Sequence, residues 1–327
     1  MLTSTLAVNA AVSQPADRFE YLSDYSPRDR PWDVHRAQAQ TVEGVYQGTA
    51  FDALAGRIKG CTGQLGFVWS ADPETGELHL KLRSAHFCRV RHCPVCQWRR
   101  SLMWQARLLK ALPSIEQAHP TARWLFLTLT VRNCKITDLR RTIQSMNSAW
   151  HRLIKRQEFD SNVLCWIRTT EVTRGKDDSA HPHFHVLMMV RPSYFSSNYY
   201  VTQRRWTEIW QECARLGYTP IVNVKAVRPK SGVGSIDKTP LRRAISETLK
   251  YSVKPQDMSD DWLIQLTRQV YHLRFIASGG VLKNVLREGE EKEEDLLLAD
   301  DPDGSSDASE PDVYFRWHRT IRRYVKR

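Results

Sequence analysis

Three segments of the chain have the hydrophobic pattern of buried β-strands. Residues 126–130 and 165–173 are rich in apolar and β-branched residues, and residues 183–190 are almost continuously apolar. Side chains two residues apart point to the same face of a strand. His183 and His185 should therefore project together from one face. The opposite face should enter a core through Phe184, Val186, Met188 and Val190.

Other segments have the spacing of amphipathic helices. Residues 138–156 and 202–216 place apolar residues at helical intervals, and residues 257–285 do so as far as a Gly-Gly break. A further helix should end at Pro255, because the residue before proline is disfavoured in a helix. Its apolar stripe is Ile245, Leu249 and Val253, and a polar stripe roughly opposite is Glu247, Tyr251 and Lys254.

The charge is large and uneven. The chain has 327 residues and a net charge of +12, but residues 288–312 contain twelve acidic residues and one base, so they carry −11 and the remainder carries +23. A body this basic indicates a polyanionic partner, which favours DNA. No apolar run reaches the roughly 18 residues of a membrane span, and the first 16 residues lack a signal-peptide pattern. We expect a cytoplasmic protein.

Composition divides the chain into six parts. We expect an extended N-terminal arm at 1–55, a zinc-binding module at 56–105, a catalytic domain at 106–256, a helical extension at 257–287, an acidic disordered linker at 288–312 and a basic aromatic tail at 313–327. The tail mixes arginines with Phe315, Trp317 and Tyr324. Contact with DNA and docking on the body as an amphipathic helix are both open for it.

A cluster of cysteines predicts a structural zinc site. Cys88, Cys93 and Cys96 lie within nine residues, and Cys61 is the expected fourth thiol. Thiolates at such spacings can close a tetrahedral Zn²⁺ site. His86 and His92 are alternatives to Cys61, and a redox Cys-x2-Cys is the alternative to zinc. Three further cysteines, at 134, 165 and 213, are isolated and should be packing residues.

Two histidines on one strand face predict a second, divalent-metal site. Glu171, on the neighbouring predicted strand, should be the third ligand beside His183 and His185. Two imidazoles and one carboxylate suit Mn²⁺ or Mg²⁺. A non-haem iron oxygenase uses the same ligands, but the basic charge favours DNA chemistry. His181 precedes Pro182, where the strand should start, and is not expected to bind metal.

Three segments, in this order, resemble the three motifs of single-tyrosine rolling-circle plasmid replication initiators (Rep proteins) of the HUH endonuclease superfamily. They are residues 126–130 (Phe-Leu-Thr-Leu-Thr), His183-Phe184-His185, and Glu247-x3-Tyr251 with Lys254. The resemblance covers residues 60 to 285 and includes the cysteine cluster. It implies an α+β fold with a central antiparallel sheet, helices packed on it and a small cysteine-rich zinc module.

The resemblance also implies an activity. Tyr251 would attack a phosphodiester at the single-stranded or hairpin nick site of a plasmid origin. The products would be a 5′-phosphotyrosine and a 3′-OH that primes a host polymerase. A host helicase is the other expected partner. Lys254 would neutralise charge at the phosphate, and Lys250 is the second candidate for this role. Glu247, one turn from Tyr251, would activate water for hydrolytic termination.

Two other functions remain open from the sequence. A related transposase or conjugative relaxase would share the histidine pair, although relaxases usually have a longer histidine triad and an N-terminal tyrosine. A zinc-containing DNA-binding regulator without catalysis would share the cysteine cluster and the charge. A nicking assay on supercoiled DNA separates the regulator from the enzymes.

Overall fold

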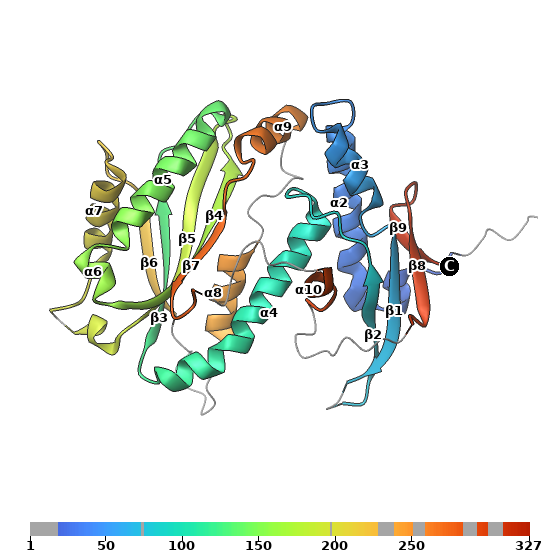
Figure 1. Ribbon diagram of the computed structural model, residues 1–327, viewed down its shortest axis with the longest axis horizontal. Helices are drawn as coiled ribbons and strands as arrows, with labels where there is room; N and C mark the ends of the chain where they lie inside the picture. Colours follow the sequence, from blue (N-terminus) through green and yellow to red (C-terminus); the bar gives the residue numbers. More distant parts are fainter. Residues whose placement is uncertain are drawn as a thin grey trace, which may run out of the picture.

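The computed structural model describes residues 19–72, 75–196, 198–227, 239–250, 259–283, 293–299 and 310–327. Two antiparallel sheets lie at opposite ends of the molecule, and helices α4 and α8 lie between them (Figure 1). The predicted α+β class, with helices packed on an antiparallel sheet, is confirmed.

The five-stranded sheet contains all three predicted strands. Its order is β6-β3-β5-β4-β7 and every pairing is antiparallel. Strand β5 is central, and its side chains at 184, 186, 188 and 190 are fully buried, as predicted. The strands are β3 (Arg123–Thr130), β4 (Val163–Arg174), β5 (Ala180–Val190), β6 (Val222–Val227) and β7 (Ile276–Gly280).

Helices cover both faces of this sheet. Helices α5 and α7 confirm the two predicted amphipathic segments, and their apolar sides pack on one face together with Phe184 and Val186. Helix α8 contacts β4 and β5 from the other face. The helices of this half are α5 (Leu139–Leu153), α6 (Gln157–Asp160), α7 (Gln203–Ala214), α8 (Thr239–Leu249) and α9 (Asp260–Gln269), with 3-10 turns at Ile136–Asp138 and Pro192–Phe195.

The second half is built around a four-stranded sheet of order β2-β1-β8-β9. Its strands are β1 (Gln64–Ala71), β2 (Leu78–Ala85), β8 (Val313–His318) and β9 (Arg323–Lys326). Its helices are α1 (Leu22–Tyr25), α2 (Arg30–Tyr46), α3 (Asp52–Gly60), α4 (Pro94–Ala118) and α10 (Glu293–Leu297), with a 3-10 turn at Pro27–Asp29. The first and last parts of the chain therefore share one core.

The N-terminal part is helical, which corrects the expected extended arm for residues 19–55. Pro31 lies in the first turn of α2, where a missing backbone N–H costs no hydrogen bond. Along α2, Trp32, Ala39, Val42 and Tyr46 recur at helical intervals and are buried. Packing of this stripe in the core formed with α3 and α4 stabilises the helix.

The C-terminal residues form a β-hairpin, which corrects both expectations for the basic tail. Strand β8 pairs with β1 and with β9. Alternation explains the result, because Phe315 and Trp317 are buried while Arg316 between them is exposed. The aromatic residues are thus core residues of the sheet. The tail is neither a free DNA-binding segment nor a helix.

Three other boundaries differ from expectation. The expected helical extension ends as a helix at Gln269, and β7 then joins the sheet beside β4. Gly279 and Gly280 permit this edge, since a Cβ on Gly279 would meet the Trp166 ring. Helix α4 runs unbroken across the expected boundary between residues 105 and 106. Within the expected acidic linker, α10 is helical; residues 288–292 and 300–309 lie outside the described residues.

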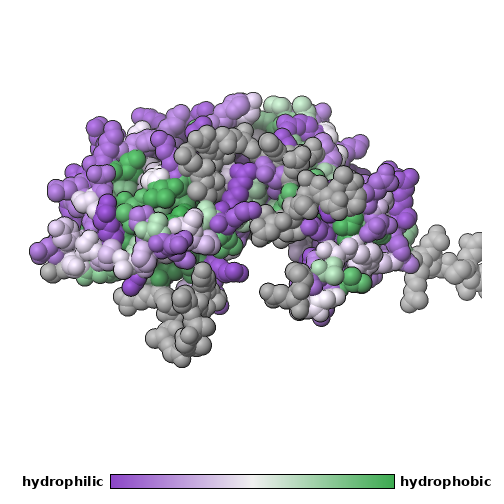
Figure 2. Space-filling view, turned by 60° about the horizontal axis from the view of Figure 1, so that its bottom comes forward, coloured by the Kyte–Doolittle hydropathy of each residue, from purple (hydrophilic) through white to green (hydrophobic). Residues whose placement is uncertain are grey.

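The surface seen in Figure 2 is largely hydrophilic. Apolar residues gather in a patch over the half that contains the five-stranded sheet. Within the described part of the chain, no helix is long and apolar enough to cross a membrane.

Candidate active site and cysteine centre

Glu171, His183 and His185 come together on the face of the sheet that α8 covers. Glu171 on β4 lies directly opposite His183 on β5. Its Oε2 is 3.2 Å from Nε2 of His183 and 2.8 Å from Nε2 of His185. All three residues are buried, with less than one tenth of their surface exposed. The predicted three-residue cluster is therefore a real constellation in the fold.

Neighbouring groups orient both imidazoles. The Nδ1 of His183 is 3.3 Å from the carbonyl of His181, and a carbonyl can only accept a hydrogen bond. Nε2 is then the ring nitrogen that faces the Glu171 carboxylate, 3.2 Å from its Oε2. Thr128 on β3 is 3.4 Å from Nδ1 of His185, and the Phe126 ring stacks on that imidazole. Such outer contacts fix the tautomer and direction of metal-binding histidines.

The donor set fits a divalent cation. Ligands about 2.1 Å from an octahedral ion lie about 3.0 Å from their neighbours, close to the two distances from Glu171 Oε2 to the imidazoles. Carboxylate oxygen and imidazole nitrogen are acceptors that repel unless a proton or cation lies between them. His181 bonds Asn133 through Nδ1 and does not belong to the cluster.

Lys250 adds a positive charge at the edge of this cluster. Its Nζ is 3.2 Å from Glu171 Oε2 and 2.6 Å from Glu247 Oε1. Burial alone would raise the pKa of Glu171, but hydrogen bonds from His183 and His185 and the charge of Lys250 outweigh it and hold that pKa well below its usual range. Burial opposes the charge of Lys250 in turn, but the two carboxylates raise its pKa. Glu171 is therefore a carboxylate at neutral pH.

The end of α8 is held against the sheet beside this cluster. Ser101 on α4 donates a hydrogen bond to the carbonyl of Leu249, and Thr169 on β4 donates one to the carbonyl of Thr248. These donors satisfy carbonyls that a helix end leaves without partners. Ile245 and Leu249 are buried, as the apolar stripe predicted. The described helix ends at Leu249, six residues before Pro255.

Of the predicted catalytic residues, only Glu247 is described. It is exposed on α8 and contacts Lys250. Tyr251 and Lys254 lie outside the described residues, so their roles stay predictions. From the sequence, Lys250 was only a second candidate for neutralising the phosphate. The structure adds its contact with Glu171, which the sequence could not predict because Glu171 lies on a strand about 80 residues earlier.

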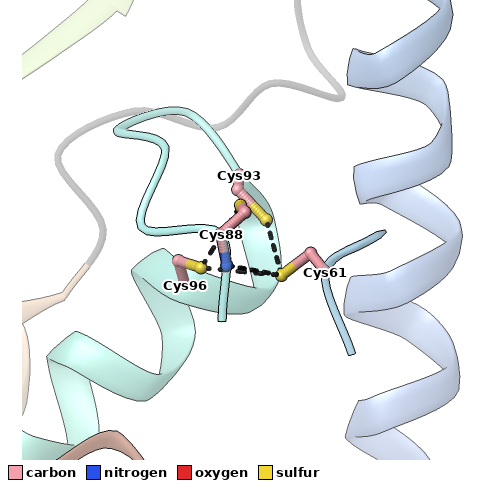
Figure 3. Close-up of side chains that lie close together, drawn as sticks. All are labelled: Cys61, Cys88, Cys93 and Cys96. Atoms are coloured by element: carbon pink, nitrogen blue, oxygen red, sulfur yellow. Dashed lines mark hydrogen bonds between the residues drawn. The ribbon is translucent and has the colours of Figure 1, made fainter. Parts of the chain in front are cut away.

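The four predicted thiols form the second cluster (Figure 3). Sγ of Cys61 is 3.7 Å from Sγ of both Cys93 and Cys96, and Sγ of Cys88 is 3.6 Å from Cys96. Sulfurs about 2.3 Å from a tetrahedral zinc lie about 3.8 Å apart. The sulfur spacing therefore fits one zinc ion, and the fourth residue of the cluster is Cys61, not His86 or His92.

Backbone N–H groups and the burial of the thiols also support a metal centre at the four cysteines. The backbone N–H groups of Cys88 and Arg89 point at the sulfurs of Cys61 and Cys96. All four cysteines are buried. Neighbouring thiols hold the pKa of Cys88 well below its usual range, because their S–H groups stabilise its thiolate. A thiolate is the form that binds metal. Four clustered sulfurs, in place of an isolated pair, favour zinc over a redox Cys-x2-Cys.

The sequence motifs indicated a plasmid replication initiator. The antiparallel sheet, the Glu-His-His cluster and the four-cysteine centre are the structural features expected of that class. Comparison with known proteins agrees. A family model described as a replication protein matches residues 79–325. A protein rep from Bacillus amyloliquefaciens is 35% identical over 91% of this chain and 94% of its own length.

Two further relatives carry the same description. A protein rep from Lentilactobacillus hilgardii is 32% identical over 91% of this chain and 95% of its own, and one from Streptococcus pneumoniae serotype 2 is 31% identical over 79% of each. No solved structure matches. The chain belongs to the Rep family of plasmid replication initiators, and DNA is the partner that this family implies.

Proposed function

We propose that this protein initiates rolling-circle replication of a plasmid by nicking one strand at the double-strand origin. The supporting observation is the position of the end of α8. Lys250 lies 3.2 Å from the Glu171 carboxylate, which faces His183 and His185. Tyr251, the proposed nucleophile, is the next residue in the sequence.

The proposed catalytic metal ligands are Glu171, His183 and His185, and the proposed metal is Mn²⁺ or Mg²⁺. When bound, the ion supplies Lewis-acid polarisation of a phosphate oxygen. Cys61, Cys88, Cys93 and Cys96 are the proposed ligands of a structural Zn²⁺. Lys250 and Lys254 are the proposed cations that neutralise charge on the phosphate.

The proposed reaction uses Tyr251 as the nucleophile. Its phenolic oxygen attacks the phosphorus, the bond to the 3′ oxygen breaks, and that oxygen leaves with a proton as a 3′-OH. A 5′-phosphotyrosine remains on the protein. Glu247 then accepts a proton from a water molecule that attacks the same phosphorus. The bond from phosphorus to the phenolic oxygen breaks and that oxygen takes up a proton, which releases the DNA, restores Tyr251 and ends the cycle. Rejoining is the reverse attack by a 3′-OH.

The 3′-OH left by this reaction is a primer, so a host DNA polymerase and a host helicase are the proposed protein partners. The proposed nick site is single-stranded or in a hairpin, as the resemblance to rolling-circle initiators implies. We propose the cytoplasm as the compartment, since plasmid DNA replicates there.

Tyr251→Phe tests the proposal. The variant should still bind an origin plasmid but lose both the nicked product and the covalent protein–DNA adduct, because only the hydroxyl is removed. The measurement is relaxation of supercoiled plasmid on an agarose gel, with adduct detected after denaturation. Tyr199→Phe, at an exposed tyrosine outside the proposed site, is the matched control and should nick normally. Wild-type nicking by the Tyr251 variant would refute the proposed nucleophile and favour a non-catalytic role.

A further inference from the structure

A basic cavity lies between the two halves of the molecule. It has a volume of about 500 Å³ and receives side chains from the loop between Cys88 and Cys93, from α4 and from the loop that joins α9 to β7. Five of its lining residues are cationic: Arg57, Arg89, Arg91, Arg100 and Lys250. None of the described residues that line it is acidic. A cavity of this charge attracts an anion.

Backbone contacts hold several of these cations in place. Arg57 and Arg100 donate to the carbonyls of Cys88 and Arg89, and Arg91 donates to the carbonyl of Leu273. Each carbonyl fixes the direction of the guanidinium that bonds to it. The Arg91 guanidinium also lies over the Phe275 ring, 4.8 Å from its centre. The cations are therefore positioned before any ligand arrives, which reduces the entropic cost of binding.

An exposed aromatic ring lies in the same cavity as the cationic side chains. Tyr271 lines the cavity and is 59% exposed, and its ring lies against His272. Arg140 donates to the Tyr271 carbonyl from outside and fixes the loop. An exposed ring beside ordered arginines is the combination by which proteins hold single-stranded nucleic acid, with bases stacked on rings and phosphates on cations.

Two turns of unusual backbone build the cavity wall. Arg89 and His272 have φ values of 57°, a left-handed conformation that non-glycine residues rarely adopt. Arg89 follows the thiol of Cys88 directly, and its N–H points at the sulfur of Cys96. The cysteine centre thus fixes one wall, and the α9–β7 loop forms the other. Such backbone strain concentrates at ligand sites.

Lys250 connects the cavity to the Glu-His-His cluster. It lines the cavity and its Nζ is 3.2 Å from Glu171 Oε2. A strand seated in the cavity would therefore lie next to the cluster.

We propose that this cavity holds one nucleotide of single-stranded DNA next to the scissile phosphate, with its base on Tyr271 and its phosphate on Arg100 and Arg89. The proposal rests on the proposed nicking function and deepens it. It assigns the cysteine module a direct part in binding the strand that is cut.

The test is binding of fluorescein-labelled oligothymidine, about 20 nucleotides long, followed by anisotropy across a salt titration with no divalent cation added. Tyr271→Ala should weaken binding about 5- to 100-fold, because stacking on one ring is lost. Tyr271→Phe should stay within about twofold, since the ring remains. Arg100→Gln should lower the slope of log affinity against log salt by about 0.7, and Arg100→Lys should restore it.

Arg204→Gln on α7 is the control, because this side chain is 90% exposed and pairs with Glu208 away from the cavity. Zinc content and melting temperature should match wild type in every variant used. Wild-type affinity and salt slope in both Tyr271→Ala and Arg100→Gln would overturn the proposal, even if Tyr251→Phe abolishes nicking. Weakened binding in a protein that never nicks would instead support the cavity and refute the nicking function.

Discussion

Lys250 forms ion pairs with two carboxylates of the site. It contacts Glu171, which faces the two histidines, and Glu247, which lies exposed on the same helix. A single ammonium group thus links the cluster to the proposed general base. Removing either carboxylate leaves Lys250 paired with the other, so the two acids can be tested separately.

Glu247→Ala should separate nicking from release. The first cleavage needs the proposed nucleophile, whereas hydrolysis needs a base, and general-base catalysis contributes about 100-fold or more. The variant should nick supercoiled plasmid at close to the wild-type rate and accumulate covalent adduct, measured by denaturing gels over time. Glu208→Ala on α7 serves as the control. Normal adduct turnover in Glu247→Ala would remove Glu247 from the mechanism.

His35 gives a pH dependence at the same scale. Burial lowers its pKa from the ordinary value to about 4, although Gln38 partly opposes this. Its ring stacks on Trp98. The unfolded chain binds this proton at higher pH than the folded one, so stability is present near neutral pH and falls as pH drops from about 6.5 towards 4, by at most about 1.4 kcal/mol per pH unit.

Urea unfolding at pH 7 and pH 5 measures this effect in wild type and in His35→Phe. The wild type should lose more stability on acidification than the variant. Both proteins share the cysteines and all other titrating groups, so those contributions cancel in the difference. Equal losses in the two proteins would show that His35 does not titrate with a depressed pKa.

At the scale of elements, α4 joins the cysteine centre to the half that contains the five-stranded sheet. Cys93 precedes its first residue and Cys96 lies in its first turn. Further along, Ser101 binds the end of α8 and Arg99, buried completely, donates to the carbonyls of Leu296 and Leu297 on α10. Loss of order at the start of α4 should therefore reach the end of α8.

Cys93→Ser with Cys96→Ser should remove the metal and destabilise this region. Structural zinc contributes about 10 kcal/mol or more to the folding of small zinc modules, so we expect loss of one zinc per chain by elemental analysis and increased proteolysis near residues 88–100. Cys134→Ser with Cys213→Ser is the matched control and should retain zinc. A double variant at 93 and 96 that keeps stoichiometric zinc would contradict the four-cysteine centre.

At the scale of the whole molecule, α2 near the start of the described chain and the C-terminal hairpin share one core. Phe315 and Tyr324 on the C-terminal hairpin are fully buried, and Tyr324 donates to the carbonyl of Thr62. Arg319 makes two hydrogen bonds of 2.9 Å to Glu43 on α2, whose side chain is completely buried. The hairpin is therefore part of the fold that supports the cysteine centre.

Arg319→Met should destabilise the protein by about 3 kcal/mol, because it leaves a buried carboxylate without its partner. We choose the lower end of the usual range since Arg319 is itself 44% exposed and water can reach the pair. Chemical denaturation measures the loss. Arg319→Met combined with Glu43→Leu should recover most of it, and Arg316→Met, on the exposed side of β8, should change stability by less than about 0.5 kcal/mol. Unchanged stability in Arg319→Met would show that the Arg319–Glu43 pair does not hold the hairpin to α2.

Local periodicity was enough to predict the central strands, two packed helices and the position of the histidine pair. In a strand the alternation of faces depends only on neighbouring residues, so Phe184 and His185 could be assigned to opposite faces from sequence. Close spacing of Cys88, Cys93 and Cys96 similarly restricts the thiols to one site, whatever the rest of the fold. These features depend on residues that are near each other in the chain.

Only the tertiary structure decided the features that depend on register and long-range pairing. The contact of Lys250 with Glu171, the joining of β7 to β4 and the return of the C-terminal hairpin to β1 each connect segments far apart in sequence. The hairpin looked like a basic tail because alternation over six residues is weak until a partner strand defines which face is buried. The cavity between the halves arises in the same way, since its cations come from separate elements that only packing brings together.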